Sequence, residues 1–363
     1  MPRILFIAHH RRDRSPSQRF RYEQYTKYLK QSSWVVTESF LIDAWDDARL
    51  YKPGNLPAKA WILFKAITRR LRDILRAFKY DIVFVQREAF LTGSTFFERA
   101  IKKSGTKLVF DFDDSIWLDN VSEANKALSF LKNASKTASI IKVCDRVFAG
   151  NPYLAEYARK YNANTVVVPT TIDTQEYTPI PRTQPFDNIT IGWSGSVTTI
   201  QHFSFAIPFL LKLKERYGNK VKITVIGDGA YRHDELQIQG LPWRKQDEIA
   251  ELSKFDIGIM PLPNDEWARG KCGLKGLQYM ALGVATIMSP VGVNTEIIQD
   301  GENGFLAATP EEWLDKLSRL IEDPDLRMRL GQAGRKTVVE KYSVQAWQDK
   351  YLGYFNQLVE KSG

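Results

Sequence analysis

Residues 256–288 constrain the fold more than any other part of this sequence. The run Asp256–Leu262 is mostly apolar and ends beside prolines, which is typical of a buried strand that stops there. After a polar loop, apolar residues at helical spacing over 272–282 predict a helix that Gly283 ends, because glycine adopts the left-handed conformation at no steric cost. The run Val284–Met288 predicts a second buried strand. This order of strand, loop, helix and strand predicts a parallel sheet.

The carboxyl end of the first of these strands is where a ligand is expected. In open α/β sheets, ligands bind beyond the carboxyl ends of the strands. The first N–H groups of the following helix lack partners within it, and Lys271 and Lys275 lie beside them in the sequence. The segment therefore suits a diphosphate. A buried helix with two solvated lysines would have the same spacing, so both interpretations stay open.

The stretch from Trp267 to Glu296 resembles the carboxyl-terminal signature of retaining glycosyltransferases of the GT-B fold, family 4 (group 1). In that family, a Glu, seven residues and a Glu-Ala-Met-Ala-x-Gly run precede a buried strand and a Gly-Gly-x-x-Glu-like turn. Gln278–Gly283 matches the second half of the first pattern, and Gly292–Glu296 matches the turn. Two positions depart from the family: Gln278 replaces the second Glu, and Gly270 stands where the first Glu belongs.

The resemblance implies the GT-B fold, in which two Rossmann-like doubly wound domains face each other across a cleft and a C-terminal helix crosses back to the first. Three prolines over 179–185 mark a linker. We therefore predict an acceptor domain over 1–184, joined by the terminal helix 343–361. A nucleotide-sugar donor domain is expected over 185–342.

The resemblance also implies the roles of the donor-binding residues. Lys271 and Lys275 would hold the diphosphate, Gln278 the ribose, and Trp243 would stack on the base, although a tryptophan packed on the surface is an equal alternative. Backbone and hydroxyl groups complete the set at three loops. The predicted donor contacts are Ser15, Arg19, Gly195, Ser196, Trp243, Lys271, Lys275, Gln278, Gly292, Val293, Asn294 and Thr295.

A polar loop follows the first predicted strand, over residues 3–8. It carries His9 and Ser15, and Arg19 lies in the helix that begins after it. Hydroxyl and guanidinium donors there would bind donor phosphates, where family 4 members often carry a glycine-rich loop. His9 is a candidate for a contact to a sugar hydroxyl. A capped helix beside a solvated basic loop is the alternative interpretation.

The strand predicted over 108–111 ends in three carboxylates, Asp111, Asp113 and Asp114. Neighbouring anions repel each other and need a partner, so packing alone rarely explains them. Asp113 and Asp114 could contact the transferred sugar or the acceptor. Asp111 and Asp113 also match the metal-binding D-x-D of GT-A transferases, and Asp111 the nucleophile of haloacid-dehalogenase-like phosphatases. We favour the first interpretation, with Asp113, Asp114 and His9 as catalytic residues and no metal.

The segment Lys59–Lys79 carries seven Lys and Arg residues and one acidic residue. Its apolar side chains share one helical face, and its cations lie around that face. Such a helix could lie in an anionic membrane interface. A helix that turns this apolar face to the core and its basic face outward is the alternative.

The composition restricts the class of protein. The chain has 363 residues, of which 44% are hydrophobic and 26% charged, with a formal charge of +9 that indicates an anionic partner. Two cysteines exclude a disulfide framework and favour a reducing cytoplasm, with a peripheral position on the inner face of the membrane left open. No nucleic-acid-binding module is recognised, so we expect no nucleic acid partner.

The function implied by the resemblance is retaining transfer of a sugar from a nucleotide-diphospho-sugar to a saccharide or lipid-linked acceptor. Synthesis of a cell-surface polysaccharide or glycolipid is the expected context, with no cofactor beyond the co-substrate. Two other classes stay open. One is a phosphatase that uses Asp111, and the other is a non-catalytic nucleotide-sugar-binding protein, which the missing Glu pair would suit.

Overall fold

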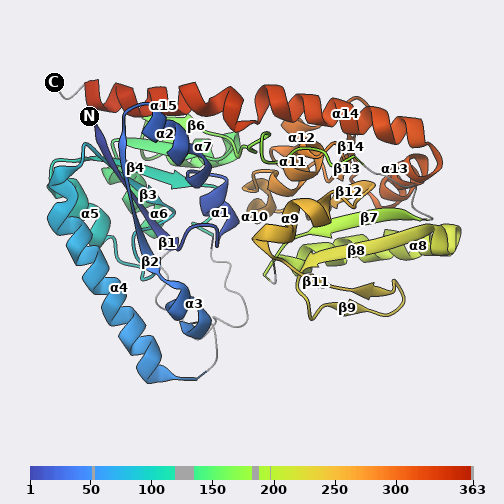
Figure 1. Ribbon diagram of the computed structural model, residues 1–363, viewed down its shortest axis with the longest axis horizontal. Coiled ribbons are helices and arrows are strands. Elements are labelled where there is room, and N and C mark those ends of the chain that lie inside the picture. Colours follow the sequence, from blue (N-terminus) through green and yellow to red (C-terminus); the bar gives the residue numbers. More distant parts are fainter. Residues whose placement is uncertain (51–53, 119–134, 182–187, 197, 361–363) are drawn as a thin grey trace. The chain divides into compact units, whose positions relative to one another are not determined.

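The computed structural model describes the chain except residues 51–53, 119–134, 182–187, 197 and 361–363 (Figure 1). The chain forms two compact units. Unit 1 is Met1–Thr170 with Gln348–Gly363, and unit 2 is Thr171–Trp347. Each unit contains one six-stranded sheet whose strand pairs are all parallel.

The predicted boundary at residue 184 lies outside the described residues. The chain divides earlier because the segment that follows Thr170 is bonded within unit 2. The N–H of Ile172 donates to the carbonyl of Tyr342 at 2.8 Å, and the N–H of Val344 donates to the carbonyl of Ile172 at 3.0 Å.

The sheet of unit 1 has the strand order β2-β1-β3-β4-β5-β6. The chain runs from β1 outward to β2 and then returns to β3 on the other side of β1, so the point where the strand order reverses lies between β1 and β3. Apolar side chains fill the strands, since both faces are covered. The strands are β1 Arg3–His10, β2 Val35–Ile42, β3 Ile82–Gln86, β4 Lys107–Phe112, β5 Arg146–Ala149 and β6 Thr165–Val167.

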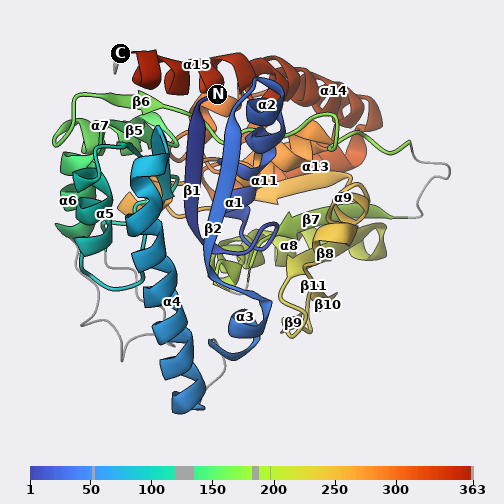
Figure 2. The same cartoon turned by 60° about the vertical axis from the view of Figure 1, so that its left-hand side comes forward.

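Helices cover both faces of this sheet. Figure 2 shows the long helix α4 on one face, with α5 beside it. The C-terminal helix α15 packs by aromatic rings, with Tyr351 stacked on Tyr25 at 4.0 Å and Phe355 packed against Phe148. Residue 361, the predicted end of that helix, lies outside the described part. The helices are α1 Pro16–Arg19, α2 Thr26–Gln31, α3 Ala44–Leu50, α4 Leu56–Arg76, α5 Phe96–Lys103, α6 Ser135–Val143, α7 Pro152–Arg159 and α15 Val344–Glu360, with 3-10 turns η1 Glu23–Tyr25 and η2 Ala77–Lys79.

The sheet of unit 2 has the order β11-β8-β7-β12-β13-β14, and its strand order reverses between β7 and β12. A small antiparallel hairpin, β9 with β10, stands apart from it. The strands are β7 Ile189–Ser194, β8 Val221–Gly227, β9 Arg232–His233, β10 Ile238–Gln239, β11 Leu241–Pro242, β12 Ile257–Met260, β13 Ala285–Met288 and β14 Phe305–Leu306. The prediction of two doubly wound α/β domains is confirmed.

The helices of unit 2 follow its strands in alternation, which buries the sheet on both faces. Phe209 of α8 stacks on Trp313 of α13 at 4.8 Å in the core. The helical segments are η4 Ile200–Ala206, α8 Ile207–Tyr217, η5 Gly218–Lys220, α9 Lys245–Leu252, α10 Glu266–Arg269, α11 Leu274–Ala281, α12 Asn294–Ile297, α13 Pro310–Glu322 and α14 Pro324–Lys341. Within the described residues, no helix is long and apolar enough to span a membrane.

Candidate functional site

Helix α11 is fixed against the point in unit 2 where the strand order reverses. The hydroxyl of Tyr279, on α11, accepts the backbone N–H of Ser194 at 2.7 Å and shares a 2.9 Å hydrogen bond with the Ser194 hydroxyl. Burial raises the pKa of Tyr279 above its usual value, so the phenol stays protonated. The end of β7 and the start of α11 are thus held together at the edge where a ligand is expected.

The start of α11 has no capping side chain. Its N-cap is Gly273, at φ +69°, a left-handed conformation that favours glycine. A Cβ atom at this position would lie 2.3 Å from Cδ1 of Ile297 and 3.5 Å from Oδ1 of Asn294, both on α12. The start of α11 therefore packs closely against α12, and its uncapped backbone suits an anion.

Lys271 and Lys275 flank this backbone. Lys271 lies in the loop before α11, with Nζ 5.1 Å from the ring centre of Trp267. Lys275 lies in the first turn of α11, with Nζ 4.9 Å from the ring centre of Trp193, the buried tryptophan near the end of β7. The structure thus brings the Lys275 ammonium to the end of β7, where a diphosphate would lie.

Gln278 is buried and belongs to a chain of hydrogen bonds. Its Nε2 donates to the hydroxyl of Tyr177 at 3.0 Å, and that hydroxyl donates to Oε2 of Glu248 at 2.6 Å. Nε1 of Trp243 donates to Oε1 of the same glutamate at 2.8 Å. The predicted ribose contact and the predicted base-stacking residue are therefore linked through Tyr177 and Glu248, two residues that the sequence patterns did not single out.

The Gly292–Thr295 turn packs tightly against the segment before α11. Gly292 has φ +55°, and a Cβ there would lie 2.6 Å from the carbonyl oxygen of Arg269. Val293 and Asn294 are buried, and Nδ2 of Asn294 donates to the carbonyl of Ser289 at 3.0 Å. The hydroxyl of Thr295 donates to the carbonyl of Gly292 at 3.0 Å. This turn is thus closely packed and internally hydrogen-bonded beside the start of α11.

The loop after β7 is held by its own hydrogen bonds. The N–H of Gly195 donates to the carbonyl of Ile226 at 2.9 Å, and the N–H of Ser196 donates to Oγ1 of Thr199 at 2.9 Å. A Cβ at Gly195 would lie 2.1 Å from the ring of Trp193. Both backbone donors that were predicted to bind the ligand have protein acceptors here, and the Ser196 hydroxyl shares a 2.9 Å hydrogen bond with the hydroxyl of Thr198.

The carboxyl edge of the unit 1 sheet holds a second polar cluster. Nη2 of Arg87 lies 2.9 Å from both Asp113 and Asp114, and the hydroxyl of Ser17 donates to Oδ1 of Asp113 at 2.5 Å. Burial acts to raise the pKa of Asp113, but the charge of Arg87 and these hydrogen bonds hold it below its usual value. Nε2 of Gln86 completes the cluster by donating to the Ser17 hydroxyl at 2.7 Å.

Arg87 has φ +63°, which is rare for a residue with a side chain and is typical of strained functional positions. Its N–H donates to the carbonyl of Asp111 at 2.7 Å. The sequence showed that the aspartates need a cation but not that Arg87 supplies it.

Asp111 does not belong to the open part of this cluster. It is fully buried and paired with Arg21, which is also fully buried, at 2.5 Å. Burial raises the pKa of Asp111, while the charge of Arg21 opposes that shift. A nucleophile must reach its substrate, so the phosphatase interpretation is not supported. The D-x-D interpretation meets the same difficulty, and among the described residues no group of three or more His, Cys, Asp or Glu side chains is arranged to hold a metal ion.

The basic loop after β1 is largely neutralised by unit 1 itself. Asp47 pairs with Arg11 at 2.8 Å and with Arg14 at 2.7 Å, and Glu38 pairs with Arg12 at 3.0 Å. The uncompensated positive charge at this strand end is therefore smaller than the sequence indicated.

Three predicted residues lie at the end of β1 and beyond it: β1 extends to His10, so His9 lies in the strand rather than in the loop, Ser15 lies in the loop, and Arg19 lies in α1. His9 has its Nε2 atom 3.9 Å from Glu88, and burial, together with Arg70, holds its pKa well below the usual value, so the imidazole is neutral. Ser15 is the N-cap of α1, and its hydroxyl makes no capping bond. Arg19 is buried, with its guanidinium 4.9 Å from the ring centre of Phe20.

The chain has the GT-B fold of solved glycosyltransferases. It superimposes on sucrose-phosphate synthase from Thermosynechococcus elongatus with a TM-score of 0.70 at 13% identity, over 99% of this chain and 100% of that one. It superimposes on HepE of Anabaena in complex with UDP-glucose with a TM-score of 0.68 at 12% identity, over 98% of this chain and 100% of that one. At these identities the likeness shows the fold.

Sequence comparison supports the same class. Residues 188–323 match the model of glycosyl transferases group 1, so the resemblance of this part of the chain to group 1 enzymes is confirmed. A 131-residue stretch is 30% identical to N-acetyl-alpha-D-glucosaminyl L-malate synthase of Bacillus anthracis, covering 33% of each protein. A 188-residue stretch is 24% identical to the capsular polysaccharide biosynthesis glycosyltransferase CapM of Staphylococcus aureus, covering 48% of each. The chain thus spans less than half the length of these relatives.

Proposed function

We propose that this protein is a retaining glycosyltransferase of family 4 that transfers a sugar from a nucleotide-diphospho-sugar to a saccharide or lipid-linked acceptor. The single observation that carries the proposal is the uncapped start of α11 at Gly273, with Lys275 beside it at the end of β7. Backbone N–H groups and an ammonium that converge at a sheet edge suit a diphosphate and few other small ligands.

The chemistry follows from where charge develops. When the bond between the sugar and the diphosphate breaks, negative charge grows on the diphosphate. Lys271, Lys275 and the backbone at the α11 start would stabilise that charge, and electrostatic stabilisation of this kind is usually the largest catalytic term. No metal is required in this proposal, because the lysines supply the positive charge.

Unit 1 would contact the sugar or the acceptor. Asp113 is held ionised by Arg87, and Asp114 shares that arginine, so both carboxylates accept hydrogen bonds from saccharide hydroxyls. The neutral imidazole of His9 suits the same role. The predicted contacts by Ser15 and Arg19 to donor phosphates remain part of the proposal.

The biological setting is also proposed from chemistry and relatives. One relative, CapM, is by name a capsular polysaccharide biosynthesis glycosyltransferase, and this supports a cell-surface polysaccharide or glycolipid as product. Cys144 and Cys272 are both free thiols, which suits a reducing cytoplasm.

The deciding experiment is thermal stabilisation by a panel of nucleoside diphosphates and their sugars, measured on the wild type, Lys275→Ala and Lys212→Ala. A nucleotide at about ten times its Kd stabilises a protein by about 1.4 kcal/mol, which is detectable as a shift of a few degrees. Lys212 is an exposed lysine on α8 and serves as the control position. We expect nucleotides of one base to stabilise the wild type and Lys212→Ala but not Lys275→Ala.

Two outcomes would contradict the proposal. If no nucleotide stabilises the wild type, the donor site does not exist. If a nucleotide binds but its sugar is neither hydrolysed nor transferred in any acceptor mixture, the protein is a nucleotide-sugar-binding protein instead. Where transfer is found, the anomeric configuration of the product, read by NMR, tests retention.

A further inference from the structure

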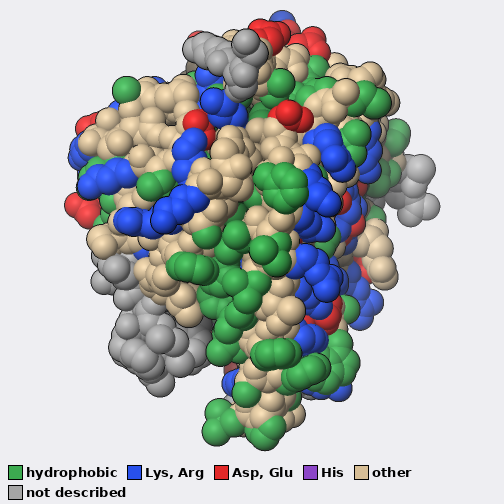
Figure 3. All heavy atoms as spheres, turned by 90° about the vertical axis from the view of Figure 1, so that its left-hand side faces the viewer, with side chains coloured by type: hydrophobic (Ala, Val, Ile, Leu, Met, Phe, Trp, Pro, Cys, Tyr) green, Lys and Arg blue, Asp and Glu red, His purple; other side chains and the backbone are tan. Residues whose placement is uncertain are grey.

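Helix α4 and the 3-10 turn η2 that continues it expose a row of large apolar side chains. This apolar stripe consists of Phe64, Ile67, Leu71, Leu75 and Phe78, at steps of three and four residues, and its members are between 37% and 75% exposed. The steps place them on one face of the helix. Figure 3 shows hydrophobic side chains in a band over this side of the molecule, with Lys and Arg side chains beside it.

The stripe is extended by neighbouring aromatic and aliphatic groups. Trp61 is 54% exposed and its ring lies 5.5 Å from that of Phe64 in a stacked arrangement. Phe96, the first residue of α5, and Leu91, in the segment before it, are also exposed, and α5 packs against α4. An apolar surface of this extent is unusual on a monomer and indicates a binding surface.

The face of α4 that points into unit 1 is polar at its centre. Arg70 is fully buried: its guanidinium donates to the carbonyls of Ala8 at 2.7 Å and Ala89 at 2.6 Å and pairs with Asp73 at 2.9 Å. Asp73 also accepts the hydroxyl of Ser39 at 2.6 Å. Turning the helix to bury the apolar stripe would break these bonds and leave the buried carbonyls of Ala8 and Ala89 without donors, so the orientation is fixed.

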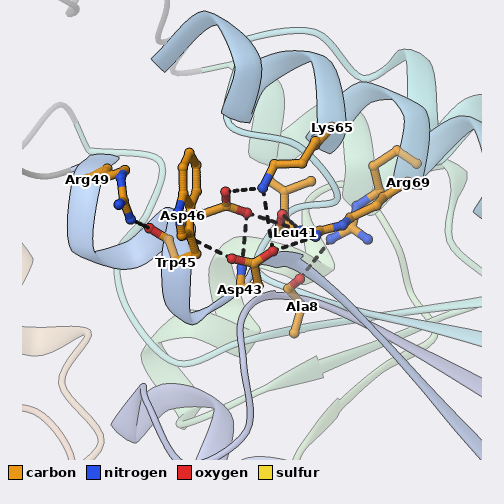
Figure 4. Close-up of polar contacts among 9 residues, drawn as sticks. Ala8, Leu41, Asp43, Trp45, Asp46, Arg49, Lys65 and Arg69 are labelled. Atoms are coloured by element: carbon orange, nitrogen blue, oxygen red, sulfur yellow. Dashed lines mark hydrogen bonds and ion pairs between the residues drawn. The ribbon is translucent and has the colours of Figure 1, made fainter. Parts of the chain in front are cut away.

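Part of the positive charge of α4 is neutralised by the segment around α3, as Figure 4 shows. Asp43 pairs with Arg69 at 2.7 Å and with Lys65 at 3.5 Å, and Asp46 pairs with both of the same cations. Arg76 pairs with Asp73 at 2.7 Å. These cations hold the helix in place rather than facing a partner.

Two cations remain beside the apolar stripe. Arg72 and Lys79 are exposed and lie three residues before and four residues after Leu75, and neither has an ion pair within the described part of the chain. Nζ of Lys79 lies 5.8 Å from the ring centre of Phe78. Asp73 is the one acid between Leu56 and Lys79, and it is buried. The stripe thus has a cationic flank without compensating anions on the same helix.

We propose that the apolar stripe and the flank of Arg72 and Lys79 form a surface that binds the interface of a bilayer containing anionic lipids. Apolar and aromatic side chains enter the boundary between headgroups and acyl chains, while the cations remain at the level of the lipid phosphates. The surface belongs to unit 1 alone and does not depend on the proposed donor site.

A second copy of the chain fits this surface less well. In a two-fold contact the same patch meets itself. Where the two helices lie antiparallel, the cationic flank of one copy faces the cationic flank of the other. Repulsion between like charges disfavours that arrangement, whereas a layer of lipid phosphates attracts both cations.

The test is sedimentation of the full chain with phosphatidylcholine vesicles, with and without phosphatidylglycerol. We expect binding to the anionic vesicles that falls as salt rises. Arg72→Glu with Lys79→Glu should weaken it by at least about fivefold for each positive charge. Leu75→Ser with Phe78→Ser should abolish it, and because these side chains are exposed, both variants should keep the melting temperature of the wild type.

Matched variants elsewhere on the surface serve as controls. Lys212→Glu with Lys222→Glu makes the same change in net charge, and Phe205→Ser with Met328→Ser removes two apolar side chains of similar exposure; both should bind vesicles as the wild type does. Equal binding to neutral vesicles, or equal loss in the controls, would overturn the proposal. A wild type that binds no vesicles would also overturn it. In that case, a dimer that Leu75→Ser with Phe78→Ser dissociates would show that the stripe binds a second copy of the chain instead.

Discussion

The hydroxyl of Tyr177 donates its one proton to Glu248 and accepts a hydrogen bond from Gln278, 3.0 Å away. This arrangement explains the departure of the sequence at position 278, where the family signature has a glutamate. A carboxylate there has no proton to donate to the phenol and would add a second negative charge beside Glu248. Gln278 therefore supplies the donor that the Tyr177 hydroxyl can accept while its own proton bonds to Glu248.

Gln278→Glu should lower the free energy of unfolding by about 1–3 kcal/mol, because it leaves a buried acceptor without a donor. The swap Gln278→Glu with Glu248→Gln should recover most of that loss, since the hydroxyl of Tyr177 can then donate towards 278 and accept from 248. Urea unfolding of both single variants and of the double variant measures this coupling. Simply additive effects would show that the three residues do not act as one network.

The buried pair of Arg21 and Asp111 supports the unit 1 sheet rather than catalysis. Asp111→Asn keeps the shape of the side chain but leaves Arg21 charged, buried and without its anion, so we expect a loss of about 3–5 kcal/mol in unfolding free energy. Glu251→Gln breaks an exposed pair with Lys254 and should cost at most about 1 kcal/mol. Similar losses in the two variants, by urea unfolding, would contradict the structural role of Asp111.

Helix α4 shows what the sequence could and could not predict. The spacing of apolar residues predicts the helix and its apolar face correctly. It favours neither orientation, because the buried position of Arg70 depends on Ala8, Ser39 and Ala89, which come from three distant segments. Core packing usually decides which face turns inward, and here a buried polar network decides instead.

The sequence also predicts the polar cluster of unit 2 better than that of unit 1. The strand, loop and helix order of unit 2 places Lys271, Lys275 and the glycine turn at one sheet edge from sequence alone, because the carboxyl ends of parallel strands share an edge. The cation for Asp113 is one of 51 Lys and Arg residues, and only the neighbouring positions of β3 and β4 select Arg87. Tertiary pairing of this kind leaves no local signal in the sequence.

The turn at Gly292 should tolerate no side chain. Gly292→Ala and Gly301→Ala both force alanine into a left-handed conformation, at φ +55° and +81°, which costs about 1–2 kcal/mol in each case. At Gly292 the new Cβ also meets the backbone carbonyl of Arg269, whereas at Gly301 its nearest neighbour is a ring carbon 3.9 Å away. We expect Gly292→Ala to cost about 1–3 kcal/mol more in urea unfolding and to weaken nucleotide binding. Equal losses of unfolding free energy in the two variants would mean that the turn adjusts to the added methyl group.

The buried carboxyl of Glu23 should make stability depend on pH. Burial raises its pKa from the ordinary 4.5 to about 7, although the N–H of Asp13 and Nε2 of Gln18 donate to its oxygens. The native state therefore binds more protons than the unfolded state between these two values. The stabilising contribution of the protonated group is complete below about pH 4.5 and is lost as the pH rises through about 7.

Glu23→Gln cannot ionise, so its unfolding free energy relative to the wild type should rise between pH 4.5 and pH 8. His10 acts in the opposite direction, since burial, together with Arg14, lowers its pKa to about 4, and its contribution is lost as the pH falls from about 6.5 towards 4. Because His10 is present in both proteins, its effect cancels in the difference. Urea unfolding of the pair at both pH values measures that difference, and a constant value would show that Glu23 titrates alike in the folded and unfolded chains.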